Sequence, residues 1–282
     1  MGAMRIALAQ LTSGRDVAAN LDLVRDWTQR AAGQDAELIV FPEATMRAFG
    51  NSLTDIAEPL DGPFATGVQQ IAGQCGVTIA VGMFTPGDRG HVRNTLLVAG
   101  PAGIVSSYDK IHLFDAFGFA ESDTVTAGTS PTVAAVGKTT VGLAVCYDIR
   151  FPGLFIQLAD LGATVTIVPA SWGAGVSAAE RAGKLRQWRL LARARALDST
   201  CFVVAVGQAD PASADRDAEH APSSAPTGIG HSMVVAPDGQ ILCELADSAE
   251  LRVVQIDPKE VDAVRASLPV LANRARTVRP SL

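Results

Sequence analysis

The 282-residue sequence predicts a single α/β domain with mixed sheets that helices cover on both sides. Three observations support this fold class. Short β-branched runs alternate with stretches of helical periodicity, which is typical of α/β folds. Some runs, such as 38–40 and 203–206, are apolar at every position, as in strands that are buried on both faces. Turn signals at residues 101–103 and at Asp238-Gly239 predict hairpins, so purely parallel sheets are not expected.

The expected elements follow one another in a regular order. We expect strands at residues 5–10, 37–41, 77–84, 95–98, 104–108, 140–146, 164–169, 202–207, 232–236 and 251–256. Helices are expected at residues 20–32, 63–75, 153–161, 178–198 and 259–266. A layered α-β-β-α sandwich fits this order, whereas a Rossmann unit does not, because no GxGxxG motif follows any strand.

Composition and charge exclude several classes of function. The net charge of −6 disfavours a nucleic-acid or anionic-membrane partner. No apolar run is long enough to span a bilayer, and the first residues lack the features of a signal peptide, so we expect a cytoplasmic protein. The domain is expected to span residues 4–276, with residues 1–3 set aside as a remnant of cloning. Residues 210–228, which are polar and aperiodic, are expected to form a surface loop.

The cysteines and histidines give no sign of a metal site. Cys75, Cys146, Cys201 and Cys243 are scattered and include no CxxC pair. The histidines show no HExxH or similar ligand spacing. We therefore expect neither a metal nor another cofactor.

Three ionisable residues, Glu43, Lys110 and Cys146, stand where strand-like runs end. In layered α/β folds, strand ends hold side chains rigidly at a crevice where ligands bind. Taken singly, each residue has an ordinary interpretation: Cys146 as a buried apolar filler, and the two charged residues as a cap or an exposed ion pair. Together, they can supply a nucleophile, a cation that lowers its pKa and a base that accepts its proton.

The segments around these residues resemble the three signature blocks of the nitrilase superfamily of carbon–nitrogen hydrolases, in the family's order. They are FPEAT at 41–45, YDKIHLFD at 108–115 and GLAVCYDIRFP at 142–152. Further matches at residues 119–122, 191–196, 230–235 and 268–270 extend the resemblance over nearly the whole chain. The stretches 201–208 and 230–239 resemble the amidase branch that contains deaminated glutathione amidase and omega-amidase more than they resemble true nitrilases.

The resemblance implies a Glu–Lys–Cys triad of Glu43, Lys110 and Cys146, with Glu121 as a second glutamate in the same pocket. Cys146 would then attack a small carboxamide, not a peptide bond, and form a thioester. Lys110 and the backbone N–H of Tyr147 are candidate donors to the oxyanion, a contact worth roughly 3 kcal/mol per donor in other enzymes. Cys146 is expected at a strand-to-helix turn.

The substrate is expected to be a small linear amide that carries a carboxylate. We expect Phe117 in the pocket wall, Trp172 against an aliphatic stem and Arg181 on the carboxylate. The ordinary alternative makes Trp172 structural and Arg181 solvated. Three other functions remain open: an N-carbamoyl amide hydrolase, an acyltransferase that uses the same triad, and a scaffold without activity. A Cys–His protease using His112 is disfavoured because no C-G-S-C-W pattern surrounds Cys146.

The resemblance also implies a homodimer or a larger homo-oligomer, with a four-layer sandwich on dimerisation. The helix at 178–198 and the C-terminal segment are the expected contacts. This helix is rich in arginine, but its charges are distributed around the helix. We therefore expect them to pair with acidic neighbours or with a partner subunit rather than with a nucleic acid.

Overall fold

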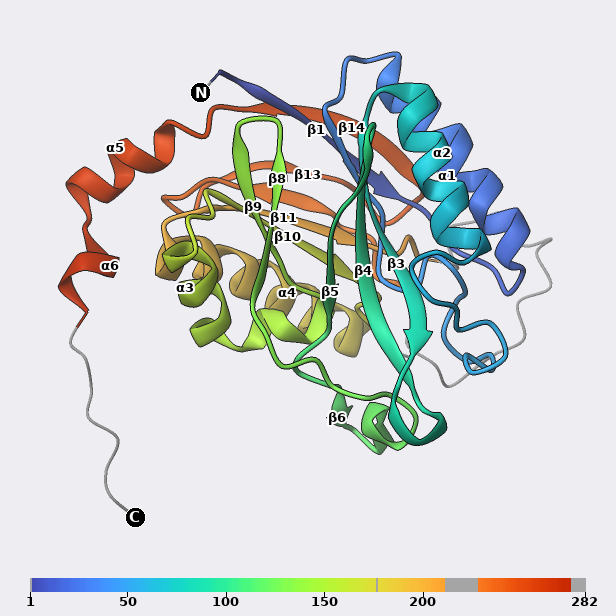
Figure 1. Ribbon diagram of the computed structural model, residues 1–282. Coiled ribbons are helices and arrows are strands. Elements are labelled where there is room, and N and C mark those ends of the chain that lie inside the picture. The colour runs from blue at the N-terminus through green and yellow to red at the C-terminus, as the bar shows by residue number, and fades with distance from the viewer. Residues whose placement is uncertain (1, 176, 211–227, 275–282) are drawn as a thin grey trace.

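The computed structural model describes residues 2–175, 177–210 and 228–274 (Figure 1). It confirms the predicted α-β-β-α sandwich: two six-stranded sheets face each other, and helices cover their outer sides. α1 (Val17–Ala32) and α2 (Pro63–Cys75) cover the first sheet, while α3 (Pro152–Asp160) and α4 (Ala178–Ser199) cover the second. All four layers lie within one chain, so dimerisation is not what creates them. The loop expected at 210–228 falls, apart from its end residues, outside the described residues.

The first sheet is mixed, as predicted, with the strand order β14-β1-β2-β3-β4-β5. β1, β2 and β3 are parallel, whereas β14, β4 and β5 pair antiparallel with their neighbours. The turn at 101–103 joins β4 to β5 as a hairpin, which confirms the sequence signal. The strands are β1 (Met4–Gln10), β2 (Leu38–Val40), β3 (Thr78–Pro86), β4 (Val92–Gly100), β5 (Gly103–Asp109) and β14 (Glu250–Ile256).

The second sheet has the order β13-β12-β11-β10-β9-β8. Its strands are β8 (Thr132–Val136), β9 (Thr139–Leu143), β10 (Val165–Ala170), β11 (Phe202–Gly207), β12 (Met233–Val235) and β13 (Ile241–Glu244). β8 and β13, the edge strands of this sheet, are not predicted from the sequence; both are short and only partly buried. The Asp238-Gly239 turn leads into β13, while residues 250–256 cross to the first sheet as β14.

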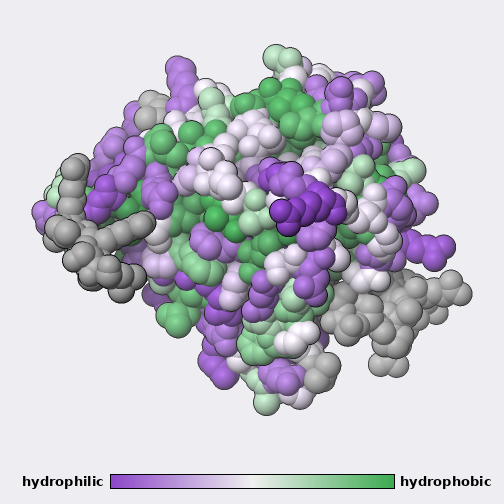
Figure 2. All heavy atoms as spheres, turned by 60° about the horizontal axis from the view of Figure 1, so that its bottom comes forward, coloured by the Kyte–Doolittle hydropathy of each residue, from purple (hydrophilic) through white to green (hydrophobic). Residues whose placement is uncertain are grey.

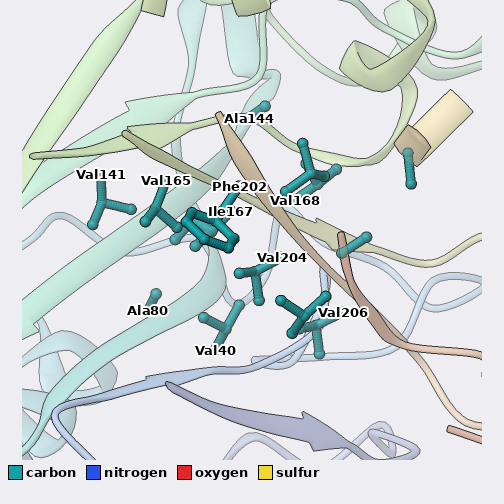
Figure 3. Close-up of a cluster of buried hydrophobic side chains, with 14 of the residues drawn as sticks. Val40, Ala80, Val141, Ala144, Val165, Ile167, Val168, Phe202, Val204 and Val206 are labelled. Carbon is teal, nitrogen blue, oxygen red and sulfur yellow. The ribbon is translucent and has the colours of Figure 1, made fainter. Parts of the chain in front are cut away.

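The main core lies between the two sheets (Figure 3). In that view Val40 and Ala80 from the first sheet lie near Val204, Val141 and Val165 from the second. β10 and β11 are buried at every position because α3 and α4 cover their other face. Complete burial of one such aliphatic side chain contributes roughly 1.5–3 kcal/mol, so this interface holds the strand ends in fixed relative positions.

The remaining elements are short. They are η1 (Asp88–Gly90), β6 (Asp115–Ala116), β7 (Phe119–Ala120), η2 (Glu121–Asp123), η3 (Cys146–Arg150), α5 (Glu260–Ser267) and α6 (Val270–Asn273). β6 and β7 form a small separate hairpin (Figure 1). α5 buries Val261 in the main core, and its Arg265 hydrogen-bonds to Thr200, which follows α4. Within the described ranges, no helix is both long and apolar enough to cross a membrane. The cytoplasmic location stays a prediction.

The arginines of α4 mostly find partners within the chain, as expected. Ion pairs join Arg181 to Asp210, Arg189 to Glu244 and Arg195 to Asp198. Arg193 donates to the carbonyl of Gly239. The helix begins with a capping box in which Ser177 and Glu180 bind each other's backbone N–H.

Candidate active site

The structure brings together the three residues predicted at strand ends. Glu43 follows β2 and Lys110 follows β5 in the first sheet, while Cys146 follows β9 in the second. The turn that carries Glu43 packs against Gly82 of β3, where an added Cβ would lie 2.8 Å from the backbone nitrogen of Ala44. A side chain at this position would push that turn away, so the glycine permits the close approach.

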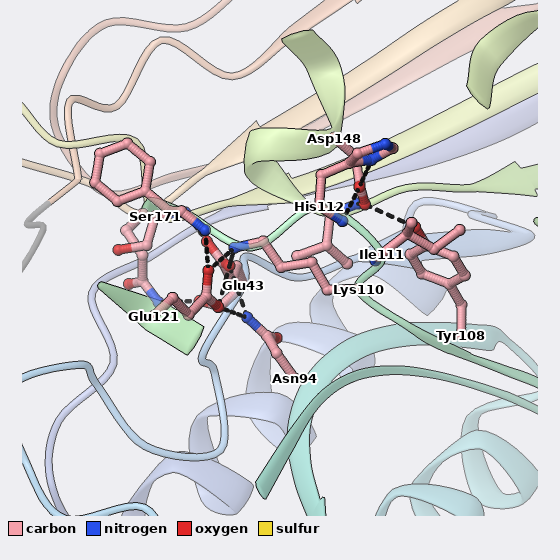
Figure 4. Close-up of polar contacts among 12 residues, drawn as sticks. Glu43, Asn94, Tyr108, Lys110, Ile111, His112, Glu121, Asp148 and Ser171 are labelled. Atoms are coloured by element: carbon pink, nitrogen blue, oxygen red, sulfur yellow. Dashed lines mark hydrogen bonds and ion pairs between the residues drawn. The ribbon is translucent and has the colours of Figure 1, made fainter. Parts of the chain in front are cut away.

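Glu43 and Glu121 share the ammonium group of Lys110 (Figure 4). Lys110 Nζ lies 2.9 Å from Glu43 Oε1, and 3.1 and 2.8 Å from the two carboxylate oxygens of Glu121. All three side chains are at least 95% buried. Burial alone would lower the pKa of Lys110, but the charges of Glu43 and Glu121 outweigh it and hold that pKa well above its usual value. Lys110 is therefore a permanent cation at this site.

Asn94 also belongs to this cluster, although it was not predicted from the sequence. Its side-chain Nδ2 donates to Glu43 Oε1 at 2.8 Å and to Glu121 Oε1 at 3.1 Å. Asn94 lies on β4 and is 1% exposed. A polar residue directly before the strand-like run 95–98 is the sequence signal that could have indicated it.

The backbone fixes both carboxylates further. Glu43 Oε2 accepts the N–H of Ser171, 2.8 Å away, at the end of β10. The carbonyl of Glu43 accepts from Gln208 Nε2 at 2.9 Å. Glu121 Oε2 accepts the N–H of Phe114 at 2.7 Å, which ties the β6–β7 hairpin to the site. No sequence pattern marks such backbone donors, because every residue except proline carries one.

Cys146 occupies the predicted strand-to-helix turn. It begins η3 with a left-handed φ of 47°, and α3 follows with Pro152 in its first turn. A positive φ is costly for a residue with a side chain, and such strain is concentrated at functional sites. Cys146 is 9% exposed. Tyr147 follows it at the start of η3, where the first N–H groups of a helix lack carbonyl partners within the helix.

The thiol of Cys146 is less acidic than the neighbouring cation led us to expect from the sequence. Burial and the negative charge of Glu43 raise its pKa well above the usual value, while Lys110 lowers it by a smaller amount. The thiol is therefore protonated in the resting protein at neutral pH. A nucleophilic role for Cys146 requires a base beside it, and Glu43 also hydrogen-bonds to this thiol.

The three residues expected to bind substrate differ in their surroundings. Trp172 follows Ser171, is 6% exposed, and donates from Nε1 to the carbonyl of Lys184. Phe117 lies at the tip of the β6–β7 hairpin, is 81% exposed and contacts the ammonium of Lys184, 4.3 Å from its ring centre. Arg181 pairs with Asp210, so its charge is already compensated.

The face that includes the β6–β7 hairpin is uneven in polarity. Figure 2 brings the lower side of Figure 1 forward and shows hydrophobic groups in several separate areas between hydrophilic ones. On the hairpin, Phe117 and Phe119 are both exposed. Scattered apolar groups of this kind are ordinary on a protein surface and do not by themselves mark an interface.

His112 belongs to a different cluster. Its Nδ1 lies 2.7 Å from Asp148 Oδ1, and its ring stacks on Phe151 with centres 3.7 Å apart. Its ring is therefore engaged by Asp148 and Phe151, which gives no support to a Cys–His pair.

Comparison with known proteins shows the family. Residues 5–266 match the family model described as carbon-nitrogen hydrolase. A hydrolase of Mycobacterium tuberculosis is 50% identical over 279 residues, which cover 98% of this chain and 97% of the relative. A deaminated glutathione amidase of Escherichia coli is 32% identical, with 90% of this chain and 91% of the relative covered. An omega-amidase of Danio rerio is 29% identical over 97% of this chain and 95% of the relative.

Solved structures agree with this result. A superfamily protein of Xanthomonas campestris with an arsenic adduct in its active site is 27% identical and matches with a TM-score of 0.82 over 99% of both chains. A variant of a Nesterenkonia amidase, whose active-site cysteine has added acrylamide, is 26% identical and matches with a TM-score of 0.74 over 94% of this chain and 98% of that chain. The chain therefore belongs to the carbon-nitrogen hydrolase family and is a hydrolase that acts on carbon–nitrogen bonds.

Proposed function

We propose that the protein is a cysteine-dependent amidase, which hydrolyses a small carboxamide to acid and ammonia through a thioester on Cys146. The observation that carries the proposal is the buried cation of Lys110, which two carboxylates hold within electrostatic reach of a thiol on a strained turn. The amidase names of two relatives and the acrylamide adduct on the cysteine of the Nesterenkonia enzyme support the same chemistry.

The first half of the reaction forms the thioester. Glu43 takes the proton of the Cys146 thiol while the sulfur attacks the amide carbon, because the thiol is protonated before reaction. Negative charge then collects on the former carbonyl oxygen. Lys110 Nζ and the N–H of Tyr147 stabilise it. The protonated Glu43 gives its proton to the amide nitrogen, the carbon–nitrogen bond breaks, and ammonia leaves.

The second half hydrolyses the thioester. Glu43, again ionised, takes a proton from water as its oxygen attacks the thioester carbon. Collapse of this second intermediate breaks the carbon–sulfur bond, and the proton returns to the thiol. Glu121 and Asn94 do not exchange protons in this scheme; they hold the ammonium of Lys110 and the carboxylate of Glu43 in place.

The test is ammonia release from a set of small amides by two cysteine variants. Cys146→Ala should abolish turnover and retain the fold by circular dichroism. Cys75→Ala, at the end of the outer helix α2, is the matched control and should keep full activity. Substantial ammonia release by folded Cys146→Ala would refute the thioester mechanism. Carbon dioxide released together with ammonia would indicate the N-carbamoyl amide hydrolase, and turnover only with an added amine would indicate the acyltransferase.

We further propose that the substrate carries a carboxylate. The deaminated glutathione amidase and omega-amidase names of the relatives support this class. Two cations beside Trp172 suit the role better than Arg181. Arg150 lies 4.9 Å from the Trp172 ring centre and hydrogen-bonds to Gln187, and Lys184 rests on Phe117. Among the described residues, the side-chain contacts of these two cations are with neutral partners, whereas Arg181 is paired with Asp210.

The carboxylate is tested with one pair of substrates. A linear amide with a terminal carboxylate should have a higher kcat/KM than its uncharged methyl ester, and Arg150→Gln and Lys184→Gln should reduce that preference. Arg181→Gln should leave it unchanged. Equal kcat/KM values for acid and ester would remove the carboxylate anchor and indicate a simple aliphatic amidase.

We also propose that the protein forms a homodimer through α4 and the C-terminal segment. Leu190 and Leu197 on α4 are 67% and 39% exposed, and Leu268 after α5 is 48% exposed. Together they offer apolar surface that a second copy would bury.

A further inference from the structure

A second buried polar cluster lies beside the proposed catalytic residues (Figure 4). Its centre is Asp148, which is fully buried. Asp148 Oδ2 accepts hydrogen bonds from the hydroxyl of Tyr108 and from the N–H of Val145, both at 2.8 Å. Asp148 Oδ1 accepts the N–H of His112 at 3.0 Å and contacts His112 Nδ1 at 2.7 Å. One carboxylate thus binds four groups from two separate segments.

These segments are the ones that carry Lys110 and Cys146. Tyr108 and His112 stand two residues before and two residues after Lys110, and Val145 directly precedes Cys146. The two segments leave different sheets, since Lys110 follows β5 and Cys146 follows β9. Figure 4 shows Lys110 between the Asp148 cluster and the Glu43 cluster. Asp148 therefore joins the two sheets at the point where the cation must meet the thiol.

A neutral residue could not make the same set of contacts. Asparagine would present an NH2 group to donors on one side, either to Tyr108 and Val145 or to His112. Burial and the charge of Asp148 raise the pKa of Tyr108, so this hydroxyl remains a donor. A buried donor left without an acceptor is costly, so loss of the carboxylate should move the backbone on at least one side.

We propose that Asp148 is a positioning residue, which fixes the ammonium of Lys110 against the thiol of Cys146 by binding the backbone next to each. The inference rests on the proposed function for the roles of Lys110 and Cys146. It concerns a buried carboxylate that takes no part in the proton transfers proposed above.

The test measures how fast acrylamide adds to Cys146 as a function of pH, followed by mass spectrometry of the peptide that contains it. Lys110 lowers the pKa of this thiol, and its effect weakens as the two groups separate. Asp148→Asn should therefore shift the pH profile to higher pH and slow addition about tenfold at pH 8. Lys110→Met should shift the profile at least as far, and the double variant no further than Lys110→Met.

Two further variants keep the test decisive. Tyr108→Phe removes one of the four contacts of Asp148 and should shift the pH profile in the same direction by a smaller amount. This variant still tests the proposal if Asp148→Asn does not fold. Arg265→Met removes partly buried hydrogen bonds to Thr200 and Ala163, and should lower Tm without moving the profile.

The proposal fails if Asp148→Asn and Tyr108→Phe lower Tm but keep the wild-type profile, because Asp148 would then be only structural. It also fails if the double variant shifts further than Lys110→Met, because Asp148 would then act on the thiol without Lys110. Acrylamide addition needs no amide hydrolysis. An error in the proposed function would show instead as ammonia release by Cys146→Ala.

Discussion

The charges around Lys110 and the charges along α4 are of the same chemical kinds but lie in different surroundings. The Lys110–Glu43 pair is 2.9 Å long and its side chains are 2% and 1% exposed. The Arg189–Glu244 pair of α4 is shorter, at 2.6 Å, but Arg189 is 42% exposed. Water screens the α4 pair, whereas the buried pair depends wholly on its protein partners. Burial, rather than distance, decides which pair can support chemistry.

The largest difference between the two regions should appear when each loses its cation. Lys110→Met leaves Glu43 and Glu121 buried without a counter-charge, which costs roughly 3–5 kcal/mol in the free energy of unfolding. The same variant should lose nearly all activity. Arg189→Met, the matched change on α4, should cost less than about 1 kcal/mol and keep activity. Urea unfolding and ammonia release measure both effects, and equal costs for the two variants would show that burial does not separate the regions.

The two buried carboxylates should also differ from each other. Glu43→Gln cannot accept a proton, so kcat should fall by about 10³-fold or more. Glu121→Gln keeps its size and weakens only the hold on Lys110, so its loss of kcat should be clearly smaller. Steady-state kinetics on one amide decides between them. Equal and small losses would place the general base elsewhere.

Asn94 should have an intermediate effect. Asn94→Leu removes the amide that bonds to Glu43 and Glu121, and it should lower kcat about tenfold with little change in KM. Asn20→Leu removes a comparable buried amide, whose Nδ2 donates to Gly14 and Met46, and should affect Tm more than kcat. If Asn94→Leu lowers Tm but leaves kcat unchanged, Asn94 has only a structural role.

Much of the site could be predicted because three of its residues stand at strand ends within recognisable blocks. Glu43, Lys110 and Cys146 were found in this way, and the structure places them together. Asn94 was missed because its role depends on β4 pairing with β3. The periodicity of a single segment does not reveal which strands pair with each other.

The fold shows the same limit. Strands with longer apolar or β-branched runs, including the partly buried edge strands β5 and β14, were predicted within a few residues. β8 and β13 were missed because they have only five and four residues and are only partly buried, so neither carries a long apolar run. The raised thiol pKa of Cys146 could not be predicted either. Its main cause is burial, which the sequence around a single cysteine does not reveal.

Alkaline pH should sharpen the contrast between buried and exposed groups. The pKa of the Cys146 thiol is higher in the folded state than in the unfolded state. The stability that the protonated thiol contributes is therefore complete below the thiol pKa of the unfolded state. It is lost as the pH rises from that value toward the pKa of the folded state. Above about pH 9, the free energy of unfolding of the wild type should fall about 1.4 kcal/mol per pH unit more steeply than that of Cys146→Ala. Parallel curves for the two proteins in urea unfolding would contradict the raised pKa.

The smallest expected effect on the single chain comes from changing the exposed apolar surface of α4, which we propose as the dimer contact. Leu190→Asp should convert a homodimer into monomers by light scattering at micromolar concentration, with little change in Tm of the single chain. Val105→Asp, a similar change at an exposed position on β5, should leave the assembly intact. A wild-type monomer with full activity would refute the proposed interface.

The most direct test of the thioester is the mass of the protein quenched with acid during turnover of a good amide substrate. The peptide that contains Cys146 should gain the mass of the acyl group, and this adduct should decay when substrate is exhausted. Cys146→Ala should show no adduct. Rapid ammonia release without any adduct on this peptide, or an adduct on another residue, would contradict Cys146 as the nucleophile.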